Sequence, residues 1–75
     1  MEPDAEIDAR HLLCPLPVLR ARKRLMAMAP GQVLRVLATD RASVIDMPHF
    51  CAQTGHEYLG CDTVGDSLAH RIRRV

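Results

Sequence analysis

The chain has 75 residues and a hydrophobic content of 48%, which suits one small folded domain and excludes a second domain or a disordered chain. It contains no tryptophan, one tyrosine and one phenylalanine, so its core must be aliphatic. The formal net charge of +1 gives no indication of an acidic partner by itself. We expect a single domain over residues 1–75, in which residues 1–4 form a loose tail.

The first half of the chain predicts a strand, a helix and a second strand. Residues 5–9 suit a short strand, and residues 18–29 have helical periodicity, which Pro30 and Gly31 end. The apolar face of this helix combines Val18, Ala21, Leu25, Met28 and Ala29. The opposite face carries Arg20, Lys23 and Arg24, whereas Arg22 falls on the apolar side. Residues 33–38 are almost entirely apolar and predict a central strand.

The second half begins with Asp40, which suits a turn or a helix cap. Residues 42–53 are helical in pattern, but Pro48 interrupts them, so we expect a break at residues 46–48, capped by Asp46, and a helix to residue 54. Strands follow over residues 57–63 and 67–75, separated by a Gly65-Asp66 turn. The order β-α-β-α-β-β predicts an α+β fold, a two-layer α/β sandwich in which two helices cover one face of a four-stranded mixed sheet.

The cysteine with the clearest chemical context is Cys14, which Pro15 and Pro17 follow at alternate positions. Two prolines so close together are tolerated only at a helix entrance, so Cys14 lies at a helix N-terminus. Such a terminus favours the reactive thiolate and alone would lower the thiol pKa by about one unit. Because proline has no N–H, however, Pro15 and Pro17 cannot donate two of the amide hydrogen bonds that would stabilise a thiolate. The motif is therefore better suited to holding a sulfur rigidly than to making an extreme nucleophile. The alternative is a buried core cysteine.

The sequence resembles the TusA/SirA-like family of small sulfur carriers. The residues that carry the resemblance are Asp8-Ala9-Arg10, Leu13-Cys14-Pro15-Leu16-Pro17, Arg22-Lys23, Gly31, Thr39-Asp40, Asp46-Met47-Pro48, Phe50-Cys51 and Gly55-His56-Glu57. The resemblance implies a sulfurtransferase in which Cys14 carries sulfur as a transient persulfide, without another cofactor. It also implies a donor protein of the cysteine desulfurase or rhodanese type and an acceptor protein. His11 stands where the family usually has glycine, which puts the loop geometry before Cys14 in question.

Several charged residues are candidates for supporting roles. Arg22 could bond Asp40 or Asp46 and so hold the second helical region near Cys14, or its side chain could simply extend to solvent. Arg20, Lys23 and Arg24 form either a solvated face or a docking patch for an acidic protein surface.

A metal site that begins with His11 and Cys14 lacks a second closely spaced ligand pair, so we predict no metal. Cys51 suits the core, and Cys61 is either a surface thiol or a second redox thiol. Three widely spaced cysteines, with neither a signal peptide nor an apolar stretch long enough for a membrane span, favour a cytoplasmic protein. The alternative function is a nucleic-acid or regulatory binding module, although the scarcity of aromatic residues argues against direct nucleic-acid binding.

Overall fold

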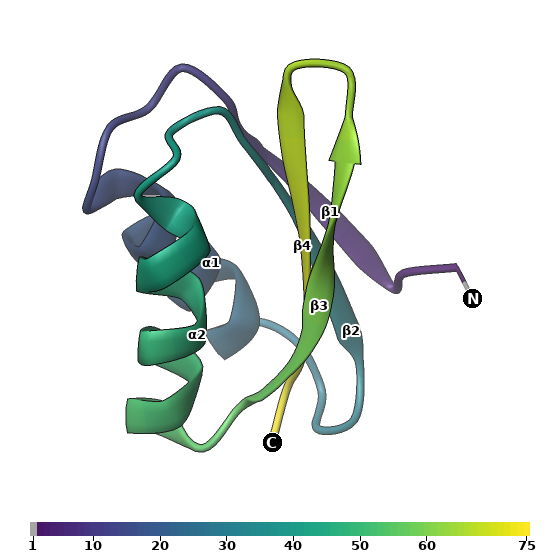
Figure 1. The fold of residues 1–75 in the computed structure, drawn as a ribbon. Helices are drawn as coiled ribbons and strands as arrows, with labels where there is room; N and C mark the ends of the chain where they lie inside the picture. The colour runs from purple at the N-terminus through teal and green to yellow at the C-terminus, as the bar shows by residue number, and fades with distance from the viewer. Residues whose placement is uncertain (1) are drawn as a thin grey trace.

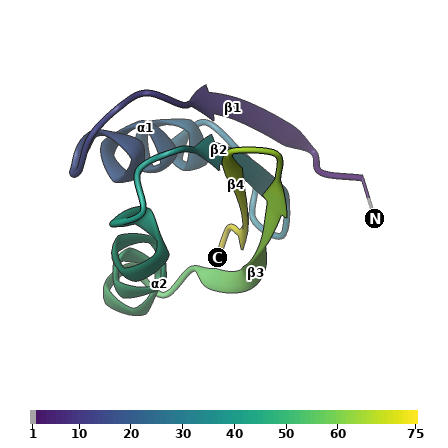
Figure 2. The same cartoon turned by 45° about the horizontal axis from the view of Figure 1, so that its top comes forward.

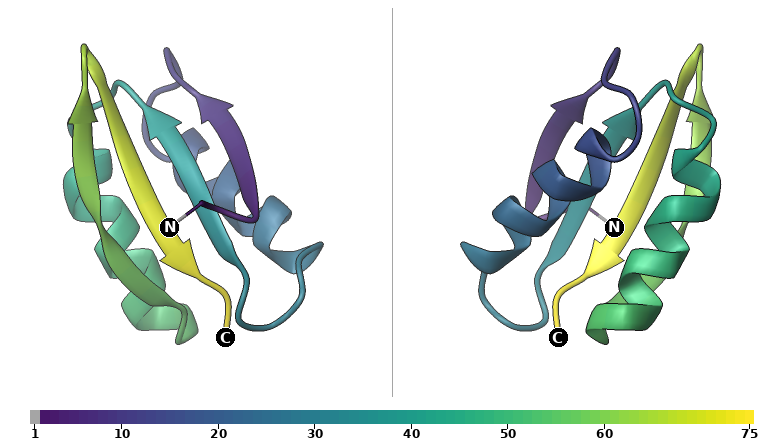
Figure 3. Two further views of the ribbon diagram at one scale, coloured as in Figure 1. Left: turned by 90° about the vertical axis from the view of Figure 1, so that its right-hand side faces the viewer. Right: turned by 90° about the vertical axis from the view of Figure 1, so that its left-hand side faces the viewer.

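Four strands form one sheet, and two helices cover one of its faces in the computed structural model, which describes residues 2–75 (Figure 1). The elements, in chain order, are β1 (Ala5–Ala9), α1 (Leu16–Met26), β2 (Val33–Ala38), α2 (Ser43–Thr54), β3 (Glu57–Val64) and β4 (Ser67–Arg73). The two views in Figure 3 show the bare face of the sheet and the face that both helices cover. The predicted element order and two-layer architecture are confirmed.

The strands are arranged in the order β1-β2-β4-β3, so β2 and β4 are central. β2 runs parallel to β1 and antiparallel to β4, which makes the sheet mixed. Because β1 and β2 are parallel, the loops that follow them leave the sheet at the same end, as Figure 2 shows. This arrangement brings residues 10–15 and residues 39–42 together.

The core lies between the sheet and the helices and is aliphatic, as the composition predicts. Its fully buried side chains include Leu25 of α1, Leu34 and Val36 of β2, Met47 of α2 and Ile72 of β4. No helix in residues 2–75 has both the length and the apolar character that a membrane span requires.

The bare face of the sheet carries three cross-strand ion pairs. They join Arg35 to Glu6 at 3.1 Å, Arg71 to Asp62 at 3.4 Å and Arg73 to Glu57 at 2.8 Å. Because the partners are substantially exposed, each pair contributes only about 0.2–1 kcal/mol.

The N-terminal tail predicted over residues 1–4 is tied to β2 at Asp4. The amide of Asp4 donates to the carbonyl of Val33 at 2.9 Å, and its carboxylate accepts from the Val33 amide at 2.7 Å. Met1, which the same prediction includes, lies outside the described residues.

Helix α1 is displaced from its predicted bounds at both ends. It begins at Leu16 instead of Val18, because Pro15 occupies the N-cap position and Pro17 fits within the first turn. It ends at Met26 instead of Ala29, where the amides of Ala27 and Met28 bond three residues back and tighten the final turn. The Arg74 guanidinium donates to the Leu25 carbonyl at 2.7 Å and closes this end of the helix.

Helix α2 is continuous from Ser43 to Thr54, so the break predicted at residues 46–48 is wrong. Pro48 removes only the bond to the carbonyl of Val44. Val44 is 47% exposed, so water can satisfy that carbonyl. The helix has already begun before Asp46, whose own N–H donates to the Ala42 carbonyl at 2.9 Å, so Asp46 is not the cap of a new helix. Gly55, at φ 85°, ends the helix as predicted.

A polar network joins α2 to the sheet inside the molecule. His70 of β4 is fully buried, and its Nε2 lies 2.8 Å from the hydroxyl of Ser43, the first residue of α2. Its Nδ1 lies 2.9 Å from the hydroxyl of Tyr58 on β3. Both ring nitrogens of His70 are therefore partnered, which offsets the cost of burying them.

Candidate functional site

Cys14 is an exposed free thiol at the end of the loop that joins β1 to α1. The following Cys14-Pro15 peptide bond is cis, and Pro17 is buried in the first turn of the helix. The sulfur is therefore presented at a helix entrance, as the sequence predicts. The alternative of a buried core cysteine is wrong for Cys14.

One carboxylate joins the Cys14 loop to the start of α2. Asp40 Oδ2 accepts a hydrogen bond from the Cys14 amide at 2.7 Å, and Oδ1 accepts one from the Ala42 amide at 3.0 Å. These two backbone hydrogen bonds hold the pKa of Asp40 below its usual range. The bond from Ala42 confirms the predicted turn role of Asp40. The bond from Cys14 to the other oxygen, Oδ2, positions the backbone of the candidate site.

His11 adopts the left-handed conformation that its family position suggests, with φ 67°. Its amide donates to Thr39 Oγ1 at 2.8 Å, which forms a second link between the two loops. Histidine tolerates this conformation better than most residues, whereas a β-branched side chain does not. The loop therefore keeps a backbone suited to glycine although a bulky side chain occupies the position.

Substitutions at His11 test whether its left-handed backbone conformation disfavours a β-branched residue. We expect His11→Val to lower the free energy of unfolding by about 1–2 kcal/mol, because valine is poorly accommodated at this φ. His11→Gly should match the wild type or gain up to about 1 kcal/mol, since relief of strain exceeds or balances the added freedom of the unfolded chain. Urea unfolding of the three proteins measures the difference. A valine variant as stable as the glycine variant would contradict the left-handed geometry.

A small cavity of about 200 Å³ opens beside Cys14, between α1 and α2. Its lining consists of Cys14, Pro15, Val18, Asp46, His49, Phe50 and Gln53. Successive turns of the outer face of α2 supply Asp46, His49 and Gln53, so the continuous helix is what lines them up. The cavity combines apolar walls with a carboxylate and an imidazole next to the thiol.

The carboxylates around Cys14 raise the pKa of its thiol. The largest cause is a hydrogen bond with Asp46, followed by partial desolvation and the negative charges of Asp46 and Asp40. The helix N-terminus therefore does not leave Cys14 with the lowered pKa that such a terminus alone would produce. Pro15 and Pro17 have no N–H, and the Leu16 amide donates to the Leu13 carbonyl at 2.8 Å instead of pointing at the sulfur. The resting group is a protonated thiol.

Removing the Asp46 charge should make the thiol more acidic. Asp46→Asn removes the carboxylate charge that faces the Cys14 thiol and leaves only a neutral acceptor, so more thiolate is present near pH 7.5 and iodoacetamide should alkylate Cys14 faster. The pH profile of alkylation should also move to lower pH. Peptide mapping by mass spectrometry separates Cys14 from the exposed Cys61, and Asp62→Asn is a matched control on β3. An unchanged Cys14 profile would contradict the role of Asp46.

The proposed link from Arg22 to an acidic residue is absent. Arg22 is exposed, and none of the ion pairs within residues 2–75 joins it to Asp40 or Asp46. The buried stripe of α1 runs instead through Pro17, Ala21 and Leu25, which turns Arg22 toward solvent. The two aspartates do lie at the Cys14 site, but backbone amides and the thiol are their partners there.

The remaining sequence candidates lie outside this cavity. Arg20, Lys23 and Arg24 line a separate groove between α1 and β1. Cys51 is buried in the core, as predicted, and its burial raises its pKa to about 11. Cys61 is an exposed free thiol on β3. No group of three or more His, Cys, Asp or Glu side chains in residues 2–75 is arranged to hold a metal ion.

Comparison with known proteins agrees with this geometry. Residues 5–74 match the family described as Sulfurtransferase TusA. The chain belongs to this family. A crystal structure of a SirA-like protein from Desulfitobacterium hafniense superposes with a TM-score of 0.76 at 29% identity, over 92% of this chain and 95% of that one. The TusA and SirA-like resemblance and the fold it implies are confirmed.

Relatives of the TusA family extend the match along nearly the whole chain. The sulfur carrier protein TusA of Allochromatium vinosum is 48% identical over 71 residues, which cover 95% of this chain and 93% of that protein. That of Pseudomonas entomophila is 41% identical, over 95% and 89% respectively. YrkF of Bacillus subtilis is 40% identical over 68 residues, and this chain spans only 37% of its length. Membership of the TusA family assigns the chain to sulfur transfer.

Five residues at the TusA-type site were not among the sequence candidates for functional roles: Val18, Thr39, His49, Phe50 and Gln53. His49 and Gln53 are exposed on α2, whereas Met47, Phe50 and Cys51 are buried. Exposure alone, however, does not reveal that this outer face borders Cys14. Only the packing of α2 beside the start of α1 shows it.

Proposed function

We propose that this protein is a sulfur carrier that accepts sulfane sulfur on Cys14 as a persulfide and passes it to an acceptor protein. The observation that carries the proposal is an exposed thiol, held in a braced loop, that opens onto a cavity of about 200 Å³. That volume exceeds what one added sulfur atom needs. The family match supports the same chemistry.

The first step is attack by the Cys14 sulfur on the outer sulfur of a donor cysteine persulfide. A new S–S bond forms at Cys14, the donor S–S bond breaks, and the donor leaves as a thiolate, so no external oxidant or reductant is needed. Because the resting thiol is protonated, its proton must leave, and Asp46 is placed to accept it. The transferred sulfur then occupies the cavity.

The second step reverses these roles. A nucleophile of the acceptor protein attacks the outer sulfur, the S–S bond at Cys14 breaks, and the Cys14 thiolate takes back a proton. A raised thiol pKa suits such a carrier, because a protonated thiol resists adventitious oxidation and alkylation between transfers. Reaction is then favoured only with a donor that is docked in place.

The surface around Cys14 fits contact with other proteins. Leu13 is 71% exposed and Ile45, near the start of α2, is 75% exposed. Exposed large aliphatic side chains beside a reactive group are typical of surfaces that meet a partner protein. The partners proposed are a donor of the cysteine desulfurase or rhodanese type and a thiol-bearing acceptor protein.

Mass spectrometry of the intact protein tests the proposal. After incubation with a cysteine desulfurase and cysteine, the mass should rise by one sulfur atom, and dithiothreitol should remove it. Peptide mapping without reductant should place the sulfur on Cys14. An unchanged mass, or sulfur found only on Cys61, would overturn the assignment.

A further inference from the structure

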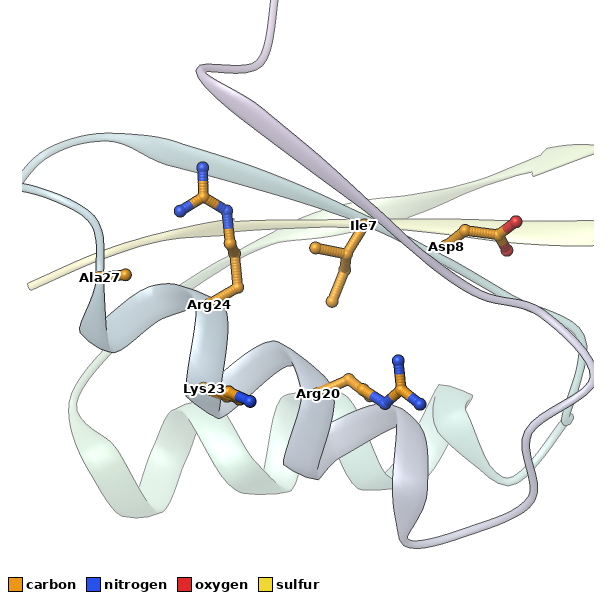
Figure 4. Close-up of a pocket in the computed structure, with 6 residues that line it drawn as sticks. All are labelled: Ile7, Asp8, Arg20, Lys23, Arg24 and Ala27. Carbon is orange, nitrogen blue, oxygen red and sulfur yellow. The ribbon is translucent and has the colours of Figure 1, made fainter.

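A groove lies between β1 and α1, separate from the Cys14 cavity. It measures about 730 Å³ and is lined by Ile7, Asp8, Arg20, Lys23, Arg24 and Ala27. The two hollows share no lining residue. Figure 4 shows Ile7 pointing from the strand toward the helix, with Arg20 and Arg24 on either side of it.

The groove is rich in positive charge. Arg20, Lys23 and Arg24 are exposed, and none of them forms an ion pair within residues 2–75. The acidic side chains of β1 are already engaged, since Asp8 pairs with Arg10 at 2.9 Å and Glu6 pairs with Arg35. Within the described part of the chain, the groove therefore presents three cations that have no ion-pair partner.

The clustering of these cations also carries a local cost. Lys23 and Arg24 lie three and four residues after Arg20, on a helix that contains no acidic residue. Like charges at these spacings destabilise a helix by about 0.2–0.5 kcal/mol per pair. Because the cluster forms no ion pair within residues 2–75 that would offset this cost, a role in binding would account for it.

The strand that forms the other wall is an edge of the sheet. β1 pairs with β2 on one side only, so its other side offers a row of backbone N–H and C=O groups without strand partners. An extended peptide can add to such an edge through main-chain hydrogen bonds, while its side chains provide specificity. Ile7, half-buried between strand and helix, gives an apolar contact in the same groove.

We propose that this groove binds an extended, acidic segment of a partner protein, which adds as a strand along β1 and places its carboxylates against Arg20, Lys23 and Arg24. This docking site goes beyond the proposed function because it does not involve the Cys14 sulfur. It is accessible whether or not the thiol carries sulfur, so it would hold a partner through loading and release.

A labelled peptide probe tests the docking site. The probe is an eight-residue peptide of alternating glutamate and valine, and its binding is measured by fluorescence anisotropy. Binding should weaken as salt rises, because the contacts are exposed ion pairs. A peptide with lysine for glutamate should fail to bind. A peptide with proline for valine should bind at least about tenfold more weakly, because proline cannot donate to the strand edge.

Charge variants of α1 provide the matched comparison. The triple variant Arg20→Gln, Lys23→Gln, Arg24→Gln should lose about tenfold or more in affinity. Arg22→Gln is the control, since Arg22 is exposed on the same helix but does not line the groove. NMR shifts on adding peptide should concentrate on the amides of β1. Equal loss in Arg22→Gln, equal binding of the proline peptide, or shifts confined to the Cys14 cavity would each overturn the proposal.

The test is independent of sulfur transfer. Loading of the triple variant from inorganic polysulfide, which needs no docking, should equal that of the wild type. If loading fails in both proteins while the peptide still binds, the proposed function fails and the docking site stands. A single-stranded oligonucleotide that displaces the peptide at equal concentration would assign the groove to nucleic acid and overturn the peptide proposal.

Discussion

Cys14→Ser is expected to abolish sulfur loading completely, because an oxygen atom in place of the sulfur cannot form a stable persulfide. The variant should keep the stability of the wild type, since Cys14 is exposed and its amide hydrogen bond to Asp40 involves only the backbone. The measurement is the mass of the intact protein after incubation with a desulfurase and cysteine. Circular dichroism during urea unfolding checks that the fold is unchanged.

The other cysteines supply the controls for this experiment. Cys61→Ser removes the second exposed thiol and should load one sulfur atom as the wild type does. Cys51 is in the core, where burial raises its pKa to about 11, and should not load in the folded protein. Sulfur that remains on Cys14→Ser and disappears from Cys61→Ser would move the carrier role to β3.

His70→Ala is expected to cost about 3 kcal/mol or more of folding free energy. The substitution leaves a cavity in the core and removes the partner of the Ser43 and Tyr58 hydroxyls. In a domain of this size, that loss corresponds to a fall of roughly 12–24 °C in Tm. Differential scanning calorimetry measures it. Should the variant fail to fold, Tyr58→Phe removes one hydrogen bond and should cost about 1 kcal/mol.

The same residue gives stability a dependence on pH. Burial lowers the pKa of His70, so the unfolded chain takes up a proton at a higher pH than the folded protein does. The stabilisation is complete above the unfolded-state pKa of about 6.5 and is lost as pH falls below it. Urea unfolding at pH 7.5 and 5.5 should show a smaller difference in His70→Gln than in the wild type.

His56 contributes to this pH dependence with the same sign. Desolvation and the nearby charge of Arg74 lower its pKa, so His56→Gln should remove a separate part of the difference. Carboxyl groups whose pKa is lowered in the folded protein change its stability only at more acidic pH, so they do not affect the comparison between pH 7.5 and 5.5. An equal pH response in the wild type and both histidine variants would contradict the buried neutral state of His70.

The fold was predictable because local signals and apolar pattern agree. The strand over Val33–Ala38 was correct to the residue, since a run of buried aliphatic side chains is typical of a central strand. The Gly65-Asp66 turn was also correct, because a glycine–aspartate pair between two strand-like runs is a local hairpin signal. Pro48 shows the limit of such local rules: the proline is tolerated because the carbonyl it leaves unpaired lies on the exposed side of α2.

The candidate site was only half predictable. Two prolines after one cysteine identify a helix entrance from the sequence alone. The partners of Cys14, however, are separated from it by 26 residues at Asp40 and by more at Asp46, and nothing local indicates which side chain meets which. The sequence suggested Arg22 as the bonding partner of these aspartates, whereas Asp40 accepts a hydrogen bond from the backbone amide of Cys14. The buried role of His70 has no signature in the neighbouring residues.

The double link made by Asp40 has a consequence for how such carriers can diversify. Residues 10–15 and residues 39–42 both leave the carboxyl ends of adjacent parallel strands, the location where open α/β sheets commonly hold their ligands. The three hydrogen bonds from backbone amides to Thr39 and Asp40 that brace the Cys14 loop and the start of α2 lie within these two short loops. As long as Cys14, Thr39 and Asp40 are kept, the other residues of these two loops can change the recognition surface while the sheet beneath and the position of the sulfur stay the same.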